Sequence, residues 1–210
     1  IAHVVVTYGG GGNNGNCCQA NVAGRAAFTV DNPIAPTVSH LSVHHSQSTG
    51  ADFNVQGGFP WAINGGSLTQ NGGHGLRIVG GQAPVSVTDL QIDENNQSGA
   101  TINTGGPLEL TGLDVTENSL DGLVLNTTGL IDMSGTRVAV HPGNFNLIIS
   151  GAAAGSKVRG NIITANDTVI AEDHEMVASL IPNLVEEVVV HNQLDNTARG
   201  VYVRSGTLTV

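Results

Sequence analysis

The chain has 210 residues, which is enough for one sizeable core. Seven Lys and Arg residues against seventeen Asp and Glu residues give a formal net charge of −10, and this argues against nucleic acid or an anionic membrane as a partner. The 29 glycines, with 11% charged and 3% aromatic residues, are typical of a turn-rich β protein with an aliphatic core. No apolar run approaches the roughly 20 residues that span a bilayer, so we expect no membrane insertion.

The N-terminal region is predicted to be a strand followed by an inserted loop. Residues 1–8 are rich in valine, and residues 9–24 are rich in glycine and asparagine. The loop holds both cysteines, Cys17 and Cys18, as neighbours. Adjacent cysteines can form a strained disulfide, bond to another chain or stay reduced, and the sequence leaves these three states open. No signal peptide opens the chain, which fits a mature or excised secreted segment.

Residues 37–151 form an internal repeat. Three sets of apolar residues recur with the same steps of 25, 24, 23 and 23 residues: Val38, Ile63, Val87, Leu110, Met133; Val43, Leu68, Ile92, Val115, Val138; Phe53, Ile78, Ile102, Leu125, Ile148. Apolar and polar residues alternate within each unit, which is the period of a strand with one buried face. The pattern predicts three short strands per turn and no helix, an all-β architecture known as a β-solenoid.

A column of glycines follows the same steps. Gly50, Gly75, Gly99 and Gly122 each open the third predicted strand, and Phe145 takes the corresponding place in the next unit. The shared spacing indicates that one tight turn is repeated in every coil.

The last part of the chain departs from this regularity. Residues 171–183 are predicted to be an irregular excursion, after which strand character returns. We therefore expect a single domain over residues 1–210 with about eight coils of 23–25 residues. The chain starts and stops within apolar, β-branched strands, so we expect either a segment of a longer solenoid or a subunit that stacks head to tail.

Two of the repeat units carry a resemblance to a known family. The segments PVSVTDLQIDENNQSGATINTGG and PLELTGLDVTENSLDGLVLNTTG resemble coils of the right-handed parallel β-helix proteins, the pectate-lyase-like superfamily. The resemblance implies a right-handed parallel β-helix. Lyases, hydrolases, tailspikes and adhesins share such coils, so the resemblance indicates architecture rather than activity.

Stacked coils bring polar side chains of neighbouring units together. The register places Glu94 and Glu117 one layer apart with Asp93 beside them, and Asp121 follows on the same face. Two carboxylates about 5 Å apart could bind Ca²⁺ or act as the acid and nucleophile of a retaining glycosidase. The alternative is a solvated ladder at the strand ends. The same register predicts a surface ion pair between Asp114 and Arg137.

His74 is the other catalytic candidate. It lies in GGHGLRI (72–78), which is similar to the GHG motif of the polygalacturonases. The family's other residues do not match, because the preceding coil offers Asp52 alone and no RIK segment follows. Gly73 and Gly75 are also expected at this turn from the repeat itself, so His74 is the one residue of the motif to which the family's catalytic role could be assigned.

These observations support two classes of function. The first is an extracellular or cell-surface structural or adhesive solenoid, with no cofactor required, that associates head to tail into a fibre or binds glycans. The second is a polysaccharide lyase or glycoside hydrolase, or a carbohydrate-binding or tailspike-type module, with its cleft along the face of Asp93, Glu94, Glu117 and Asp121. Because no complete catalytic set is evident, the sequence favours the non-enzymatic function.

Overall fold

A computed structural model describes residues 4–7, 26–31, 37–55, 57–139, 141, 145–153 and 156–164, together with the backbone of strands at 175–178, 187–188, 193–195 and 202–203. The predicted inserted loop at 9–24, with Cys17 and Cys18, lies outside the described residues. Within the predicted excursion at 171–183, Glu175–Ala178 form a strand, and the other residues of that range lie outside the described part.

The described residues form two parallel sheets. The first contains β1 (Val4–Thr7), β3 (Thr37–His44), β5 (Trp61–Thr69), β7 (Val85–Asp93), β9 (Leu108–Thr111), β10 (Asp114–Thr116), β12 (Ile131–Ser134), β13 (Arg137–Ala139), β15 (Lys157–Arg159), β16 (Ile162–Thr164), β18 (Glu187–Val188) and β19 (Gln193–Asp195). The second contains β2 (Phe28–Asp31), β4 (Ala51–Val55), β6 (Leu76–Gly80), β8 (Ala100–Thr104), β11 (Leu123–Thr127), β14 (Phe145–Ser150), β17 (Glu175–Ala178) and β20 (Tyr202–Val203). No helix in the described part of the chain is long and apolar enough to cross a membrane.

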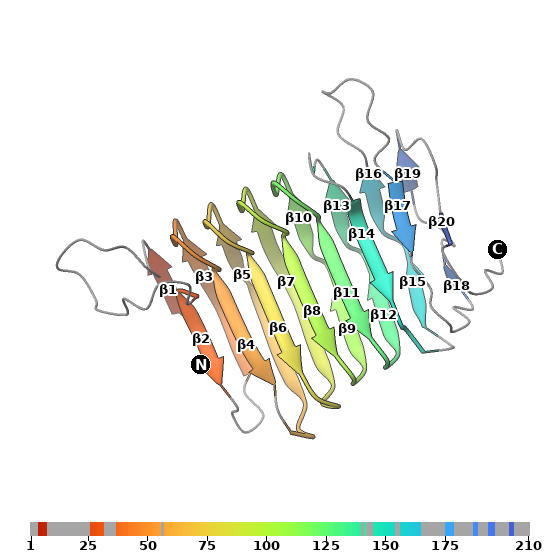
Figure 1. The fold of residues 1–210 in the computed structure, drawn as a ribbon, viewed down its shortest axis with the longest axis horizontal. Helices are drawn as coiled ribbons and strands as arrows, with labels where there is room; N and C mark the ends of the chain where they lie inside the picture. The colour runs from red at the N-terminus through yellow and green to blue at the C-terminus, as the bar shows by residue number, and fades with distance from the viewer. Residues whose placement is uncertain are drawn as a thin grey trace.

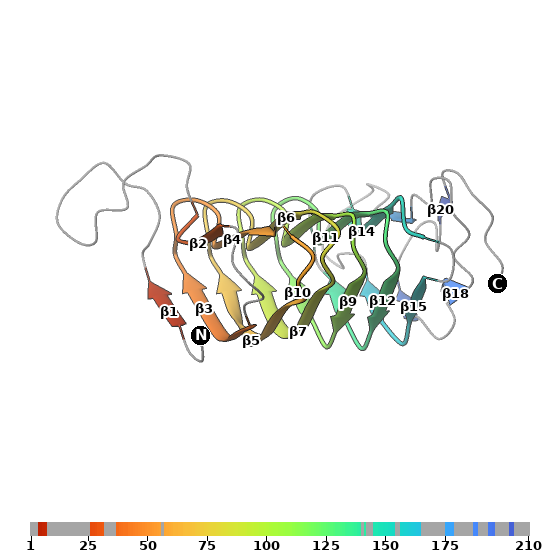
Figure 2. The same ribbon diagram turned by 90° about the horizontal axis from the view of Figure 1, so that it is seen from below.

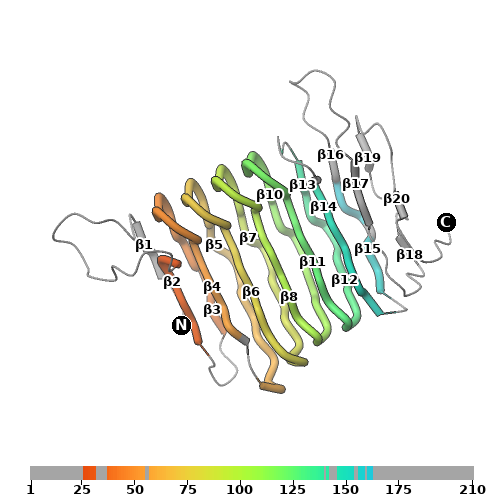
Figure 3. The backbone as a smooth tube through the Cα atoms, in the orientation of Figure 1, coloured from red at the N-terminus to blue at the C-terminus, as the bar shows by residue number. Residues whose placement is uncertain are grey.

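The chain winds between the two sheets as a right-handed coil. In Figure 1 it advances from left to right while nearer strands such as β8 and β11 run down the page and strands behind them such as β7 and β10 run up. Figure 2 shows the two sheets edge-on with the turns between them, and the tube in Figure 3 follows successive coils along the axis. The predicted fold class, a parallel β-helix, is confirmed.

The structure describes about five regular turns rather than about eight. These turns lie between β3 and β14, where nearly every residue is described. Further strands extend the second sheet to eight, but they are separated by residues outside the described part.

The first two apolar columns have the predicted register. Val38 pairs with Ile63, and the series continues through Val87 and Leu110 to Met133. In the second column, Val43, Leu68, Ile92, Val115 and Val138 pair in the same way. All of these side chains are at most 1% exposed. The core is therefore a set of aliphatic stacks, because each layer places an apolar side chain directly above the previous one.

The third column is correct only as far as Leu125. Leu125 pairs with Ile149, not with Ile148, which instead pairs with Val124 on the outer side of the sheet. The turn before β14 holds one more residue than the equivalent turns of the preceding coils, so the step from Leu125 to Ile149 is 24 residues and the side chains of β14 lie on the opposite face from the one predicted. For the same reason the residue in register with Gly122 is Asn146, and the prediction of Phe145 at that place is wrong.

A bend divides the first sheet into two arms, where the sequence predicted separate strands. In the early coils β3, β5 and β7 are continuous and bend at a residue with positive φ: His40 (53°), Gly65 (70°) and Asp89 (51°). In the next two coils the bend falls at Gly112 and Gly135, between β9 and β10 and between β12 and β13. The left-handed backbone turns the strand direction without a long loop, so the apolar columns of both arms face one interior.

Candidate functional site

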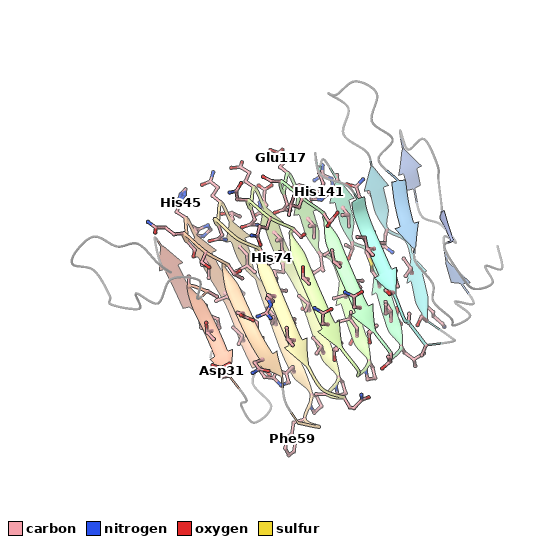
Figure 4. All side chains as sticks on the ribbon, viewed as in Figure 1. Asp31, His45, Phe59, His74, Glu117 and His141 are labelled. Carbon is pink, nitrogen blue, oxygen red and sulfur yellow. The ribbon has the colours of Figure 1, made fainter. Side chains whose placement is uncertain are left out.

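The predicted polar columns lie along the edge where the first sheet turns into the second. His45 and Glu117 mark this edge in Figure 4. The registers pair Thr69 with Asp93 and Asp93 with Thr116. The hydroxyl of Thr116 donates a hydrogen bond of 2.8 Å to Oδ1 of Asp93. Asp93 is therefore engaged within the stack and does not project freely toward a ligand.

Glu94 and Glu117 occupy equivalent positions in adjacent coils. Both are exposed and both have φ of 52°, a conformation that turns the chain at the strand end. The side-chain amide of Gln70, one coil earlier, donates a hydrogen bond to the carboxylate of Glu94. The structure thus brings these two glutamates together as a stacked ladder on one side of a turn.

Asp121 lies apart from the two glutamates. It belongs to the next column of the turn, where the amide of Gly99 donates a 2.9 Å hydrogen bond to the main-chain oxygen of Asp121. Asp121 is half-buried and Glu117 is exposed. Among the described residues, no three His, Cys, Asp or Glu side chains gather in a way that could hold a metal ion.

His74 is half-buried in the same turn. Burial is the main cause that lowers its pKa, opposed by a hydrogen bond with the backbone of Ser98; the charge of Arg77 lowers the pKa further, whereas Asp52 and Asp121 raise it. Nδ1 of His74 has no hydrogen-bond partner within the described structure. A neutral imidazole could accept a proton, but the geometry does not place a second catalytic group on this nitrogen.

The glycines around His74 are explained by close packing. A Cβ atom on Gly75 would lie 2.4 Å from Cγ2 of Ile92 and 2.8 Å from the main-chain oxygen of Gly99. A Cβ atom on Gly73 would lie 2.6 Å from the main-chain nitrogen of Thr49. Both glycines are needed for coils to approach one another here, so the likeness to GHG follows from the turn.

The two described ion pairs lie on the outer faces of the sheets. Arg137 Nη1 is 3.0 Å from Asp114 Oδ1, as the register predicted, and both side chains are about half-exposed. Arg77 Nη1 is 2.8 Å from Asp52 Oδ2. Each pair contributes below about 1 kcal/mol to stability because both partners retain contact with water.

A buried polar ladder that was not predicted from the sequence lies directly inside this edge. It consists of Ser46, Asn71, Asn95, Asn118 and His141, all at most 3% exposed. The first four members each follow an exposed residue of the turn, and the five members keep the same steps of 25, 24, 23 and 23 residues as the apolar columns. The recurrence of polar residues at this position is visible in the sequence, but their burial is not.

The asparagines satisfy main-chain groups that the turn leaves without strand partners. Oδ1 of Asn95 accepts hydrogen bonds from N and Nδ2 of Asn71 at 3.1 and 2.8 Å. Asn95 Nδ2 donates to the main-chain oxygen of Leu68 at 2.9 Å and to Oδ1 of Asn118 at 2.8 Å. A buried polar group is stable when it is hydrogen-bonded, so this ladder links the coils through their interior.

His141 continues the ladder in the place of an asparagine. Its Nδ1 accepts a 3.1 Å hydrogen bond from the amide of Asn118, and its Nε2 lies 3.2 Å from the main-chain oxygen of Val115. These partners require a neutral ring with the proton on Nε2. Burial lowers the pKa of His141 to about 4, against the smaller raising effects of its backbone hydrogen bonds with Asn118 and Val115. His141 is therefore a structural group.

A groove that was also not predicted from the sequence lies on the opposite edge of the rod. It has a volume of about 400 Å³ and is lined by Pro60, Trp61, Pro84, Val85, Ser86, Pro107, Leu108, Glu109, Leu130 and Asp132. Phe59, adjacent to Pro60, projects at this lower edge in Figure 4, away from Glu117 and His141. The signal in the sequence was the proline that precedes the first strand of three successive coils.

Comparisons of the chain with models of protein families, with curated proteins and with solved structures gave no match.

Proposed function

We propose that the protein is a non-catalytic structural or adhesive β-solenoid of the pectate-lyase-like type that works outside the cell or at its surface. The observation that carries the proposal is the separation of the groove from the candidate catalytic residues. The groove lies along the edge formed by Pro60, Pro84, Pro107 and Leu130, whereas Glu117 lies on the opposite edge (Figure 4), with Glu94 at the equivalent position of the preceding coil. A substrate in the groove would not meet these carboxylates. The groove's own acidic residues, Glu109 and Asp132, occupy equivalent positions of successive coils and so lie on the same side of any ligand.

The environment of the glutamates also supports a structural role. A retaining glycosidase places its two carboxyl groups on either side of the scissile bond and gives them different environments, so that one is an acid and the other a nucleophile. Glu94 and Glu117 occupy the same exposed position of successive turns, on the same side of any ligand. This arrangement suits a solvated surface ladder.

The test is a screen of acidic and neutral polysaccharides for new reducing ends or unsaturated products. The proposal predicts no turnover by the wild-type protein. Turnover by the wild-type protein would refute the proposal and establish the lyase or hydrolase alternative, and its loss in Glu94→Gln or Glu117→Gln would assign the catalytic role to these glutamates. Binding of the same polysaccharides without turnover would identify a carbohydrate-binding module.

Head-to-tail association into fibres is a separate part of the proposal. Parallel coils offer main-chain donors and acceptors at the face of the last layer, and a second rod could continue the two sheets. Light scattering and electron microscopy over a range of protein concentrations test this. A monodisperse monomer at every concentration would contradict it.

A further inference from the structure

The groove on the proline edge is built from four successive coils. Main-chain hydrogen bonds of 2.8–2.9 Å connect Trp61 N to Pro84 O, Val85 N to Pro107 O and Leu108 N to Leu130 O. Pro60, Pro84, Pro107 and Leu130 therefore form one ladder, and all four are exposed. Proline has no amide hydrogen and these carbonyl groups of Pro84, Pro107 and Leu130 already accept hydrogen bonds, so the ladder presents an almost wholly apolar surface.

A polar row runs beside this ladder on the outer face of the first sheet. The registers pair Ser86 with Glu109 and Glu109 with Asp132, so the two carboxylates are one layer, about 4.8 Å, apart. Both are exposed, and neither forms an ion pair within 4.0 Å among the described residues. Lys157 is next in the row, in register with Asp132. The groove therefore combines an apolar wall with an acidic wall, and a lysine marks one end.

We propose that this groove binds an extended, basic segment of a partner polypeptide. The apolar side chains of this segment pack against the ladder of prolines and Leu130, while an arginine or lysine lies over Glu109 and Asp132. The inference rests on the proposed function, because an adhesive rod needs a surface that recognises a partner. Two unpaired carboxylates one layer apart attract a cation, and the planar guanidinium of arginine can bond to both. Lys157 repels the basic residue, so the bound segment extends from the carboxylates toward Ser86 and Pro60.

The composition of the groove favours a polypeptide over the other occupants. A second copy of this chain would bring a molecule of formal net charge −10 against an acidic row. A glycan would lack an aromatic platform in the groove, since the lining residue Trp61 is only 4% exposed and cannot offer its face. Apolar side chains and a positive charge match both walls at once.

Trp61 makes the test direct, because it is the single tryptophan of the chain and lines the groove. The probe is a synthetic peptide of about eight residues with alternating arginine and valine, long enough in extended form to cover four layers. A matched peptide has glutamate in place of arginine. We expect saturable change in Trp61 fluorescence with the arginine peptide and none with the glutamate peptide.

Two double variants locate the binding surface. Glu109→Gln with Asp132→Asn should weaken binding about fivefold to tenfold, because two exposed charge interactions are lost. The control, Glu94→Gln combined with Glu117→Gln, removes two charges from adjacent coils on the opposite edge and should leave affinity unchanged. Leu130→Asn should weaken binding, whereas Phe59→Asn should not, because Phe59 is exposed at the same edge but does not line the groove.

Several results would overturn the inference. These are equal binding of the two peptides, equal effects of the two double variants, or no saturable signal up to about 1 mM peptide. Saturable fluorescence change with neutral oligosaccharides but not with the arginine peptide would assign the groove to glycans, and self-association blocked by Leu130→Asn would assign it to a second copy. Failure of peptide binding leaves the polysaccharide screen unaffected, and turnover in that screen refutes the proposed function without altering the fluorescence result.

Discussion

The buried asparagine ladder allows a sharp test of what holds the coils together. Replacement of Asn95 by alanine removes four hydrogen bonds: two that its Oδ1 accepts from Asn71 and two that its Nδ2 donates to Leu68 and Asn118. At about 1 kcal/mol for each net hydrogen bond, the free energy of unfolding should fall by about 4 kcal/mol. The substitution also leaves Nδ2 and the main-chain nitrogen of Asn71 buried without the oxygen that accepted their hydrogen bonds. A decrease of this size in the free energy of unfolding is among the large effects of single substitutions.

The assay is urea denaturation followed by far-UV circular dichroism and by Trp61 fluorescence. Asn96→Ala is the matched control, because Asn96 is the next residue and is exposed, and it should change the free energy of unfolding by less than about 0.5 kcal/mol. If Asn95→Ala cost no more than Asn96→Ala, the ladder would not stabilise the fold and the reasoning would be wrong.

Three further predictions concern the ladder, the glycine column and the corrected register. Burial lowers the pKa of His141 from 6.5 to about 4, so between these two pH values the unfolded chain binds a proton on this side chain and the folded chain does not. The contribution of neutral His141 to the free energy of unfolding is therefore fully present above about pH 6.5 and is lost as pH falls toward 4. The loss is about 3 kcal/mol at roughly 1.4 kcal/mol per pKa unit; denaturation at pH 7 and pH 4 should show a smaller difference for His141→Asn than for wild type, and equal differences would contradict the assignment. Gly75→Ala should cost about 1–3 kcal/mol through overpacking against Ile92, whereas Gly58→Ala, where a Cβ meets nothing within 4 Å, should be nearly neutral in the same assay. Ile149→Ala should cost about 2–5 kcal/mol and Ile148→Ala much less, because Ile149 is 2% exposed and Ile148 lies on the outer side; the reverse order in thermal or urea denaturation would restore the register predicted from sequence.

The repeat could be predicted from the sequence because each coil is stabilised mainly by contacts with its neighbours. A parallel stack requires compatible side chains at the same position of every turn, so Val43, Leu68 and Ile92 had to recur in step. The same logic predicted the Asp114–Arg137 pair, which the structure confirms. Periodic features of this kind are local in the repeat even though they are distant in the chain.

Three features depended on the tertiary structure. One extra residue before β14 shifted the register from Ile148 to Ile149, and insertions in turns leave no periodic signal in advance. Polarity alone did not indicate that Asn95 lies inside the turn while Glu94 lies outside, because a single backbone turn with positive φ separates them.

The position of the groove relative to the glutamates was the third feature. The sequence determined that Glu94 and Glu117 share one column, and that prolines precede the first strand of successive coils. Only the folded coil shows that half a turn of chain places these two columns on opposite edges of the rod. Side chains act together chemically only when they are close in space. In a solenoid, the distance between two side chains of the same coil depends on where the backbone bends, as it does at Asp89 and Gly112, and not on their spacing along the chain.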